Sequence, residues 1–202
     1  AFDISTLVSG AKWSTKRSGS PASLTVTAIV DDTVAWNPGG ILVLKNGSTG
    51  LFYGYVVKIS QSEKDQVQIT AYDQTWYLKK NKETYVFTGK RADQIVKQIA
   101  EDFKLKTGTL ANTGYAIPSM IEDGQTLFDI ALKAIDLTLI NTGKMFVLWD
   151  NFGKLTLTDG DHGRRKGEAG PVRGRREPCH RLHLRPGHRF RHLQQNQAGQ
   201  GQ

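Results

Sequence analysis

Residues 41–59 decide the fold, and they read I-L-V-L-K-N-G-S-T-G-L-F-Y-G-Y-V-V-K-I. Two runs rich in aliphatic and aromatic residues flank the segment 46–50, in which asparagine and glycine tolerate a left-handed backbone. Such runs on either side of a turn are typical of paired strands. The pattern therefore predicts a β-hairpin with strands over 41–45 and 51–59.

The residues on either side of this hairpin extend the β pattern. In 24–30, L-T-V-T-A-I-V, apolar residues alternate with threonine, which predicts a strand with one face more buried than the other. Asn37-Pro38-Gly39-Gly40 is turn chemistry. Further downstream, Val67, Ile69, Ala71 and Trp76 are expected to continue the sheet. Short strands separated by turns predict a small β-barrel or sandwich over residues 1–87.

The hydrophobic period changes at residue 88. Apolar residues at helical spacing predict helices near 91–103 and 125–139, with Thr88 a candidate cap of the first. Glu122 and Asp123 are expected at the start of the second helix, where a helix dipole favours negative charge. Apolar runs around residues 151–153 predict a second hairpin. Residues 88–159 are thus expected to form a small two-helix α+β domain, so the fold class is mainly β with an α+β part.

The positive charge of the chain is confined to its last fifth. Residues 1–159 hold 17 Lys+Arg and 16 Asp+Glu, whereas residues 160–202 hold 10 and 3. All five histidines and the single cysteine also follow residue 160. A segment so rich in arginine, glycine and histidine buries too little apolar surface to offset its chain entropy. We expect 160–202 to be a disordered basic tail whose deletion leaves stability nearly unchanged.

The composition of this tail is typical of GC-rich coding DNA translated in a shifted frame. When permitted codons are moved by one nucleotide, R-L-H-L-R-P-G-H-R-F-R-H-L can spell G-Y-T-Y-D-P-D-I-D-S-D-T-Y, a strand-like string in the style of residues 1–159. We therefore expect a frameshift, or a misassigned gene end, after about residue 159. The DNA sequence around codon 160 tests this expectation.

Several ordered segments of residues 1–159 carry a resemblance to a known family. They are D-I-S-T-L-V-S (3–9), W-S-T-K-R-S-G-S-P-A-S-L (13–24), W-N-P-G (36–39), F-Y-G-Y-V (52–56), A-Y-D-Q-T-W-Y-L-K-K-N (71–81), Y-V-F (85–87), A-D-Q-I-V-K-Q-I-A-E-D-F (92–103), T-L-F-D-I-A-L (126–132) and T-G-K-M-F-V-L (142–148). Together they resemble the baseplate hub proteins of contractile phage tails, of the PBSX prophage type, within the wider late control protein D and tail-hub group. Relative to that family, the chain is expected to lack a first strand and the C-terminal half.

This resemblance implies a structural protein rather than an enzyme. It implies a tail-tube-like β-barrel domain and a homotrimer that joins the tail tube to spike and baseplate proteins. The expected location is the tail or baseplate of a virion or tail-like particle assembled in the bacterial cytoplasm. The resemblance implies no catalytic, cofactor-binding or metal-binding residues, and neither specific nucleic-acid binding nor membrane insertion.

Two chemical alternatives start from the residues themselves. Cys179 and His183, with His188 and His192, have spacings like half of a zinc finger, but a second cysteine and the helical spacer are missing. Without His or Cys in 1–159, a hydrolase would need a carboxylate pair. The candidates for such a peptidoglycan hydrolase are Asp73, Glu101, Asp102, Glu122 and Asp123.

Aromatic and basic residues suggest two binding alternatives, each with a simpler explanation. The segment 79–82, K-K-N-K, beside Trp76 and Tyr77 could bind single-stranded nucleic acid, although a solvated loop next to core aromatics explains it as well. The four tryptophans could stack on glycans, but packing in a core or a subunit interface is the expected role. They are Trp13, Trp36, Trp76 and Trp149.

Overall fold

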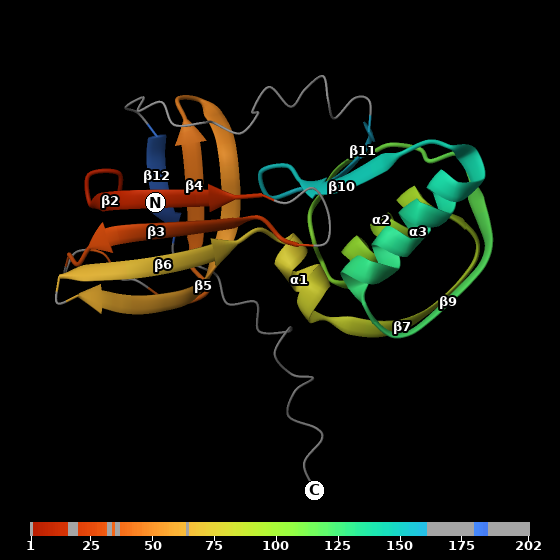
Figure 1. Ribbon diagram of the computed structural model, residues 1–202, viewed down its shortest axis with the longest axis horizontal. Coiled ribbons are helices and arrows are strands. Elements are labelled where there is room, and N and C mark those ends of the chain that lie inside the picture. The colour runs from red at the N-terminus through yellow and green to blue at the C-terminus, as the bar shows by residue number, and fades with distance from the viewer. Residues whose placement is uncertain are drawn as a thin grey trace, which may run out of the picture.

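The computed structural model describes residues 2–15, 20–31, 34, 37–63, 65–160 and 180–185. These residues form two modules that lie side by side along the long axis of the molecule (Figure 1). The sheet module contains a single seven-stranded sheet, and the α+β module contains three helices with a three-stranded and a two-stranded sheet. The predicted mainly β fold with an α+β part is confirmed.

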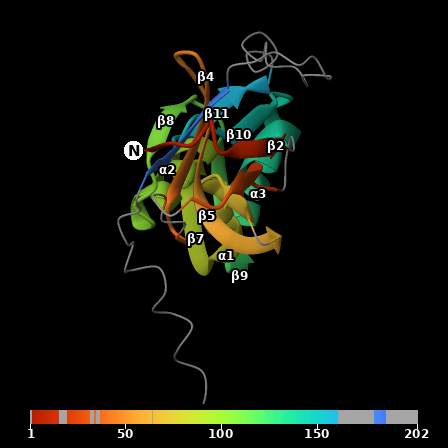
Figure 2. The same cartoon turned by 90° about the vertical axis from the view of Figure 1, so that its left-hand side faces the viewer.

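The sheet module is a curled half-barrel, seen from its own side in Figure 2. Its strand order is β1-β12-β4-β5-β6-β3-β2, with β1 and β2 at the two ends. The predicted first hairpin is confirmed, since β4 pairs with β5 in antiparallel register around a turn at residues 47–48. The strands are β1 (Phe2–Asp3), β2 (Val8–Ser14), β3 (Ser23–Ile29), β4 (Ile41–Asn46), β5 (Thr49–Glu63), β6 (Gln66–Tyr72) and β12 (His180–Arg185).

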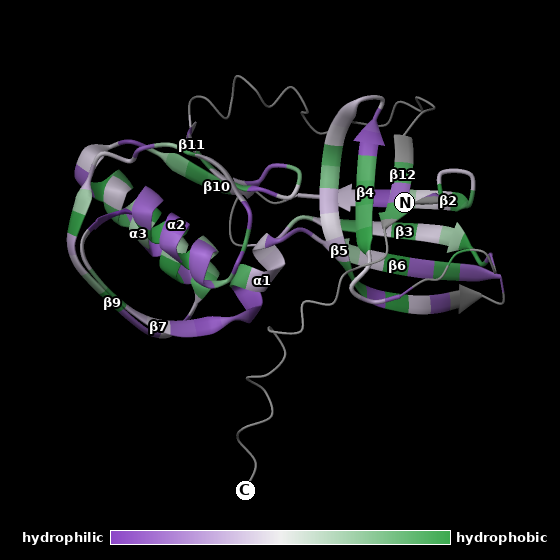
Figure 3. Ribbon diagram, turned by 180° about the vertical axis from the view of Figure 1, so that it is seen from behind, coloured by the Kyte–Doolittle hydropathy of each residue, from purple (hydrophilic) through white to green (hydrophobic). Residues whose placement is uncertain are grey.

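Alternating burial explains why these segments are strands. Along β3, Leu24, Val26 and Ala28 are fully buried while the residues between them are half-buried, as the sequence pattern predicts. Figure 3 shows the same alternation of hydrophobic and hydrophilic residues along the sheet. Val67, Ile69 and the other inward residues of β4, β5 and β6 complete one hydrophobic cluster inside the curl.

The α+β module has its own core. Its elements are α1 (Thr75–Lys80), β7 (Lys82–Arg91), α2 (Ala92–Asp102), β8 (Thr107–Leu110), β9 (Ala116–Thr126), α3 (Leu127–Thr142), β10 (Phe146–Asp150) and β11 (Leu155–Asp159). The two predicted helices correspond to α2 and α3, and the second predicted hairpin to β10 and β11. Their apolar faces form a second cluster. This cluster already includes Leu78 and Phe87, so the change of core precedes residue 88.

Three local predictions are wrong. Trp76 lies in α1 rather than in a strand, and Thr88 lies in β7. The N-cap of α2 is Arg91, whose amide donates to the Gln94 side chain at 3.0 Å. Glu122 and Asp123 lie in β9, because β9 stays extended to pair with β7 until Thr126. Thr126 caps α3 by accepting a hydrogen bond from the Asp129 amide at 3.1 Å.

The expectation of a tail without structure is wrong for residues 180–185. This segment forms β12, which pairs in antiparallel register with β1 and with β4. Leu182 and Leu184 are 3% and 5% exposed and belong to the core of the sheet module. The rest of the predicted tail, residues 161–179 and 186–202, lies outside the described residues, and the shifted frame remains a prediction.

Within the described residues, no helix combines the length and the apolar character that crossing a bilayer requires.

Candidate functional site

The five candidate carboxylates do not form one catalytic pair. Glu101, at the end of α2, makes an exposed ion pair with Lys97 at 3.8 Å. The neighbouring Asp102 accepts a hydrogen bond from the Tyr85 hydroxyl at 2.7 Å, and Asp123 accepts one from the Thr84 hydroxyl at 2.7 Å. Each of these side chains therefore has a partner: Glu101 pairs within α2, whereas Asp102 and Asp123 bond to residues of β7.

Glu122 and Asp73 are the two buried members of this set, and Glu122 lies in the α+β module. Its side chain is 7% exposed and forms an ion pair with Lys133 of α3, whose side chain is 53% exposed. The pair ties β9 to α3. An ionised carboxylate that loses its only cationic partner in such a place bears an uncompensated desolvation cost.

We expect Lys133→Ala to lower the free energy of unfolding by about 1–2 kcal/mol, because Glu122 would stay buried without a partner. The matched control is Lys97→Ala, which breaks an ion pair exposed on both sides and should cost less than about 0.5 kcal/mol. Urea denaturation of both variants measures the difference. Equal losses would show that the Glu122 ion pair contributes no more than a surface pair.

Asp73 has a structural role at the crossing between the modules. It is 5% exposed and lies between β6 and α1. Its Oδ2 accepts from the Ala22 amide at 3.0 Å, and its Oδ1 accepts from the Thr75 amide at 3.0 Å and the Thr75 hydroxyl at 2.5 Å. Burial raises the pKa of Asp73, while these hydrogen bonds act in the opposite direction.

A half-buried carboxylate, Asp150, lies close to Asp73, and the sequence did not indicate it. Its Oδ1 accepts from the Gly153 amide at 2.8 Å, and its Oδ2 is buried without a hydrogen-bond partner. Burial, followed by the nearby charge of Asp73, raises the pKa of Asp150 to about 6. Burial, with a contribution from Asp150, also raises the pKa of Tyr55 to about 12.

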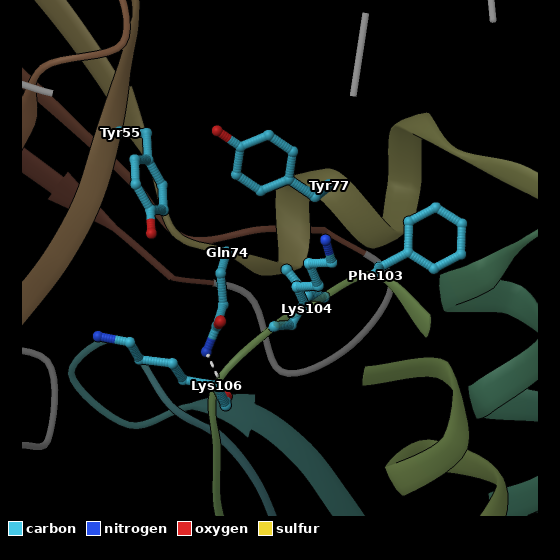
Figure 4. Close-up of a pocket in the computed structure, with 7 residues that line it drawn as sticks. Tyr55, Gln74, Tyr77, Phe103, Lys104 and Lys106 are labelled. Carbon is cyan, nitrogen blue, oxygen red and sulfur yellow. Dashed lines mark hydrogen bonds between the residues drawn. The ribbon is translucent and has the colours of Figure 1, made fainter. Parts of the chain in front are cut away.

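A small cavity adjoins these residues. Figure 4 shows the rings of Tyr55 and Tyr77 beside Gln74, whose side chain donates to the Lys106 carbonyl at 3.2 Å. The cavity measures about 40 Å³. That volume admits a water molecule or two, whereas cavities that hold substrates or cofactors measure about 300–1,000 Å³.

The metal and binding alternatives find no support in the described residues. No group of three metal-ligating side chains occurs there. His183 lies in β12, whereas Cys179, His188 and His192 lie outside the described part. Lys80, from the basic segment 79–82, lies over the Trp76 ring at 5.9 Å from its centroid.

The tryptophans have separate places in the fold. Trp76 stacks on Tyr72 with the ring centroids 6.3 Å apart, which gives it the expected packing role. Trp149 lies on β10 and donates from its indole nitrogen to the Thr158 hydroxyl at 3.3 Å. Trp36 lies outside the described residues. Trp13 lies on β2 and is 38% exposed.

The open end of the half-barrel, at β2, is a candidate surface for a partner. Trp13 and Ala11 of β2 pair with Leu24 and Val26, and directly opposed residues point to the same face. Leu24 and Val26 are fully buried, yet Trp13 and Ala11 are exposed. The inward face of β2 therefore lacks cover from the described residues, and no described strand pairs with its outer edge.

Comparison with solved structures relates this fold to phage tail proteins. The 43 kDa tail protein of prophage MuSo2 from Shewanella oneidensis superposes with a TM-score of 0.55 at 17% identity, over 75% of this chain and 54% of that one. The tail protein from Neisseria meningitidis MC58 gives 0.52 at 14% identity, over 68% and 41%. At these identities the likeness concerns the fold alone.

Sequence comparison finds nearer relatives. Two proteins of Bacillus subtilis (strain 168), the uncharacterized protein YqbQ and the phage-like element PBSX protein XkdQ, are each 41% identical to this chain over 120 residues. The match covers 59% of this chain but only 36% and 37% of those proteins, so it spans little more than a third of their length. Residues 11–166 match the family described as YQBQ-like. The chain therefore belongs to the YQBQ-like family.

Proposed function

We propose that this protein is a structural component of a phage tail or phage-tail-like particle, and that it forms the hub that joins the tail tube to the spike at the baseplate. Two findings support the tail assignment: the relationship to the PBSX protein XkdQ and the fold shared with two tail proteins. The hub assignment goes further and rests on the resemblance of residues 1–159 to hub proteins.

The observation that carries this proposal is the open edge at β2. A sheet edge with unpaired backbone groups and uncovered inward side chains is a template for a strand of another chain. The opposite end of the sheet, at β1, is a different surface. When two different surfaces of one subunit meet, the contact is heterologous, and it closes into a ring if the rotation permits. Three copies arranged in this way would form a hub continuous with a tube.

The proposal includes no chemical reaction. Four of the candidate carboxylates have hydrogen-bond or ion-pair partners that explain them, namely Asp73, Glu101, Asp102 and Asp123, and Glu122 pairs with Lys133. The alternative, a tail-associated peptidoglycan hydrolase, would require two carboxylates facing one bond across a substrate-sized site. The roughly 40 Å³ cavity beside Asp73 is too small for a glycan.

The oligomeric state tests the hub proposal. We expect the frame-corrected, full-length protein to have the mass of a trimer in light scattering. Trp13→Glu should weaken this association at least about 30-fold, because it places a charge where an aromatic residue is expected to be covered. The matched control is Ile140→Glu, which charges a side chain that is 77% exposed in the α+β module, and it should remain trimeric.

Two results would contradict the proposal. One is a full-length protein that stays monomeric at all concentrations. The other is release of peptidoglycan fragments by the purified protein, abolished by Asp73→Asn or Glu101→Gln, which would favour the hydrolase.

A further inference from the structure

The hairpin tip, residues 150–153, seats the α+β module on the sheet module. Its Phe152 ring lies directly over Gly50 of β5, where a Cβ atom would come within 2.5 Å of the ring. Conversely, Gly153 lies under Tyr53 of β5, where a Cβ atom would come within 2.8 Å of that ring. Phe152 and Tyr53 also meet edge to face, with their centroids 5.7 Å apart. The two modules therefore interlock through two glycine–aromatic contacts.

A half-buried carboxylate, with one oxygen fully buried, lies at the base of this tip. Asp150 begins the turn and accepts from the Gly153 amide, so its side chain shapes the loop that carries Phe152. Its other oxygen is buried and makes no hydrogen bond within normal geometry, although the Gln74 side chain lies near enough to act against the rise of the Asp150 pKa. Asp73, at the crossing between the modules, and Tyr55, on β5, are the titratable groups that face it. Among the described residues, neither Asp73 nor Asp150 has an ion-pair partner.

Asp73 and Asp150 lie at one junction without a cation, so they repel each other when both are ionised. A proton on Asp150 removes this repulsion and also removes the cost of a negative charge on a buried oxygen that makes no hydrogen bond. Ionisation does the reverse and favours exposure of the carboxylate to water. The change of charge therefore acts on Asp150, the residue that shapes the loop carrying Phe152.

We propose that Asp150 is a proton-controlled latch between the modules, which holds the hairpin tip on β5 when the carboxyl group is neutral and releases it when the group is ionised. The proposal concerns the rigidity of the subunit and does not depend on the hub function. At neutral pH the modules can then move relative to each other, and in acid they form one rigid body.

The direction of the pH dependence follows from the raised pKa of Asp150. The group ionises near pH 6 in the seated state and near 3.8 when exposed to water. The stabilisation of the seated state is therefore complete below about pH 4 and is lost as the pH rises through 6. A difference of about two pKa units allows the ratio of seated to released tip to change about ten- to a hundredfold.

The contact between Phe152 and Gly50 provides the measurement. In NMR spectra of the whole chain, the Gly50 Hα resonances should be displaced by the Phe152 ring current, and the two residues should share a nuclear Overhauser effect. Between pH 7.5 and pH 4.5 both signals should strengthen, with a midpoint near 6. In Asp150→Asn, which mimics the neutral carboxyl group, both should be strong and independent of pH.

The matched control is Asp136→Asn, which removes the same charge from an exposed position on α3 and should titrate like the unaltered protein. The latch is refuted if the Phe152–Gly50 contact in the unaltered protein is equally strong at both pH values. It is also refuted if Asp150→Asn retains the pH dependence. Because the unaltered protein alone decides the first outcome, the test does not require the variant to fold.

Discussion

Replacing Leu182 by alanine is expected to lower the free energy of unfolding by about 3 kcal/mol. The side chain is 3% exposed and lies in the core of the sheet module, and truncating a buried leucine removes apolar contacts and leaves a cavity. The Leu182 backbone also joins the strands, since its carbonyl accepts from the Ile4 amide at 2.9 Å and its amide donates to the Ser5 hydroxyl at 2.8 Å.

Chemical denaturation of the whole chain, with tryptophan fluorescence as the signal, measures this loss. The matched control is His183→Ala on the same strand, because His183 is only half-buried and should cost less than about 1 kcal/mol. For the same reason, deletion of 160–202 should destabilise the protein, contrary to the expectation from composition alone. Equal stability of Leu182→Ala and the unaltered protein would mean that β12 does not hold its place in the sheet.

Gly54→Ala should have a comparable effect, a loss of about 3 kcal/mol. Gly54 lies on β5, next to the segment of β6 that ends at Tyr72. A Cβ atom at this position would lie 2.5 Å from the carbonyl oxygen of Tyr72, which is backbone and cannot rotate away. The sheet would have to open locally to admit a single methyl group.

Gly10→Ala on β2 is the matched control for this substitution. A Cβ atom there meets nothing within 4 Å, so the change should be neutral or stabilise by about 0.4–1 kcal/mol through the unfolded chain. Thermal unfolding of the two variants side by side measures the contrast. If Gly54→Ala melts at the temperature of the unaltered protein, the close approach of β5 and β6 at Tyr72 is incorrect.

Much of the local structure could be predicted because it depends on neighbouring residues. The turn chemistry of 46–50 and the alternation of 24–30 are short-range signals, and both strands lie where these signals place them. The same holds for α2 and α3, whose apolar faces follow the helical period. Errors arose at the ends of elements. The extended run of β9 to Thr126, for instance, depends on pairing with β7, some 35 residues earlier.

The local sequence predicts the candidate site less well than it predicts the strands and helices. Asp150 follows a strand and precedes a turn, a place where aspartate is common, so its local sequence indicates nothing unusual. It becomes notable only because the fold brings it to the buried Asp73, far away in the chain, and covers one of its oxygens. The exposure of Trp13 likewise depends on how far the sheet curls, which no residue of β2 determines.

By itself, the sequence determined the two hairpins, the two principal helices, the change from a β pattern to an α+β pattern, and the absence of His and Cys chemistry from residues 1–159. Only the tertiary structure decided that six residues of an arginine-rich segment complete the sheet between β1 and β4. The physical reason is that periodicity and turn chemistry act between near neighbours. The pairing of β12 with β1 instead joins Asp3 with His183, 180 positions away (183 − 3), and it is favoured because two leucines reach a core that distant strands have built.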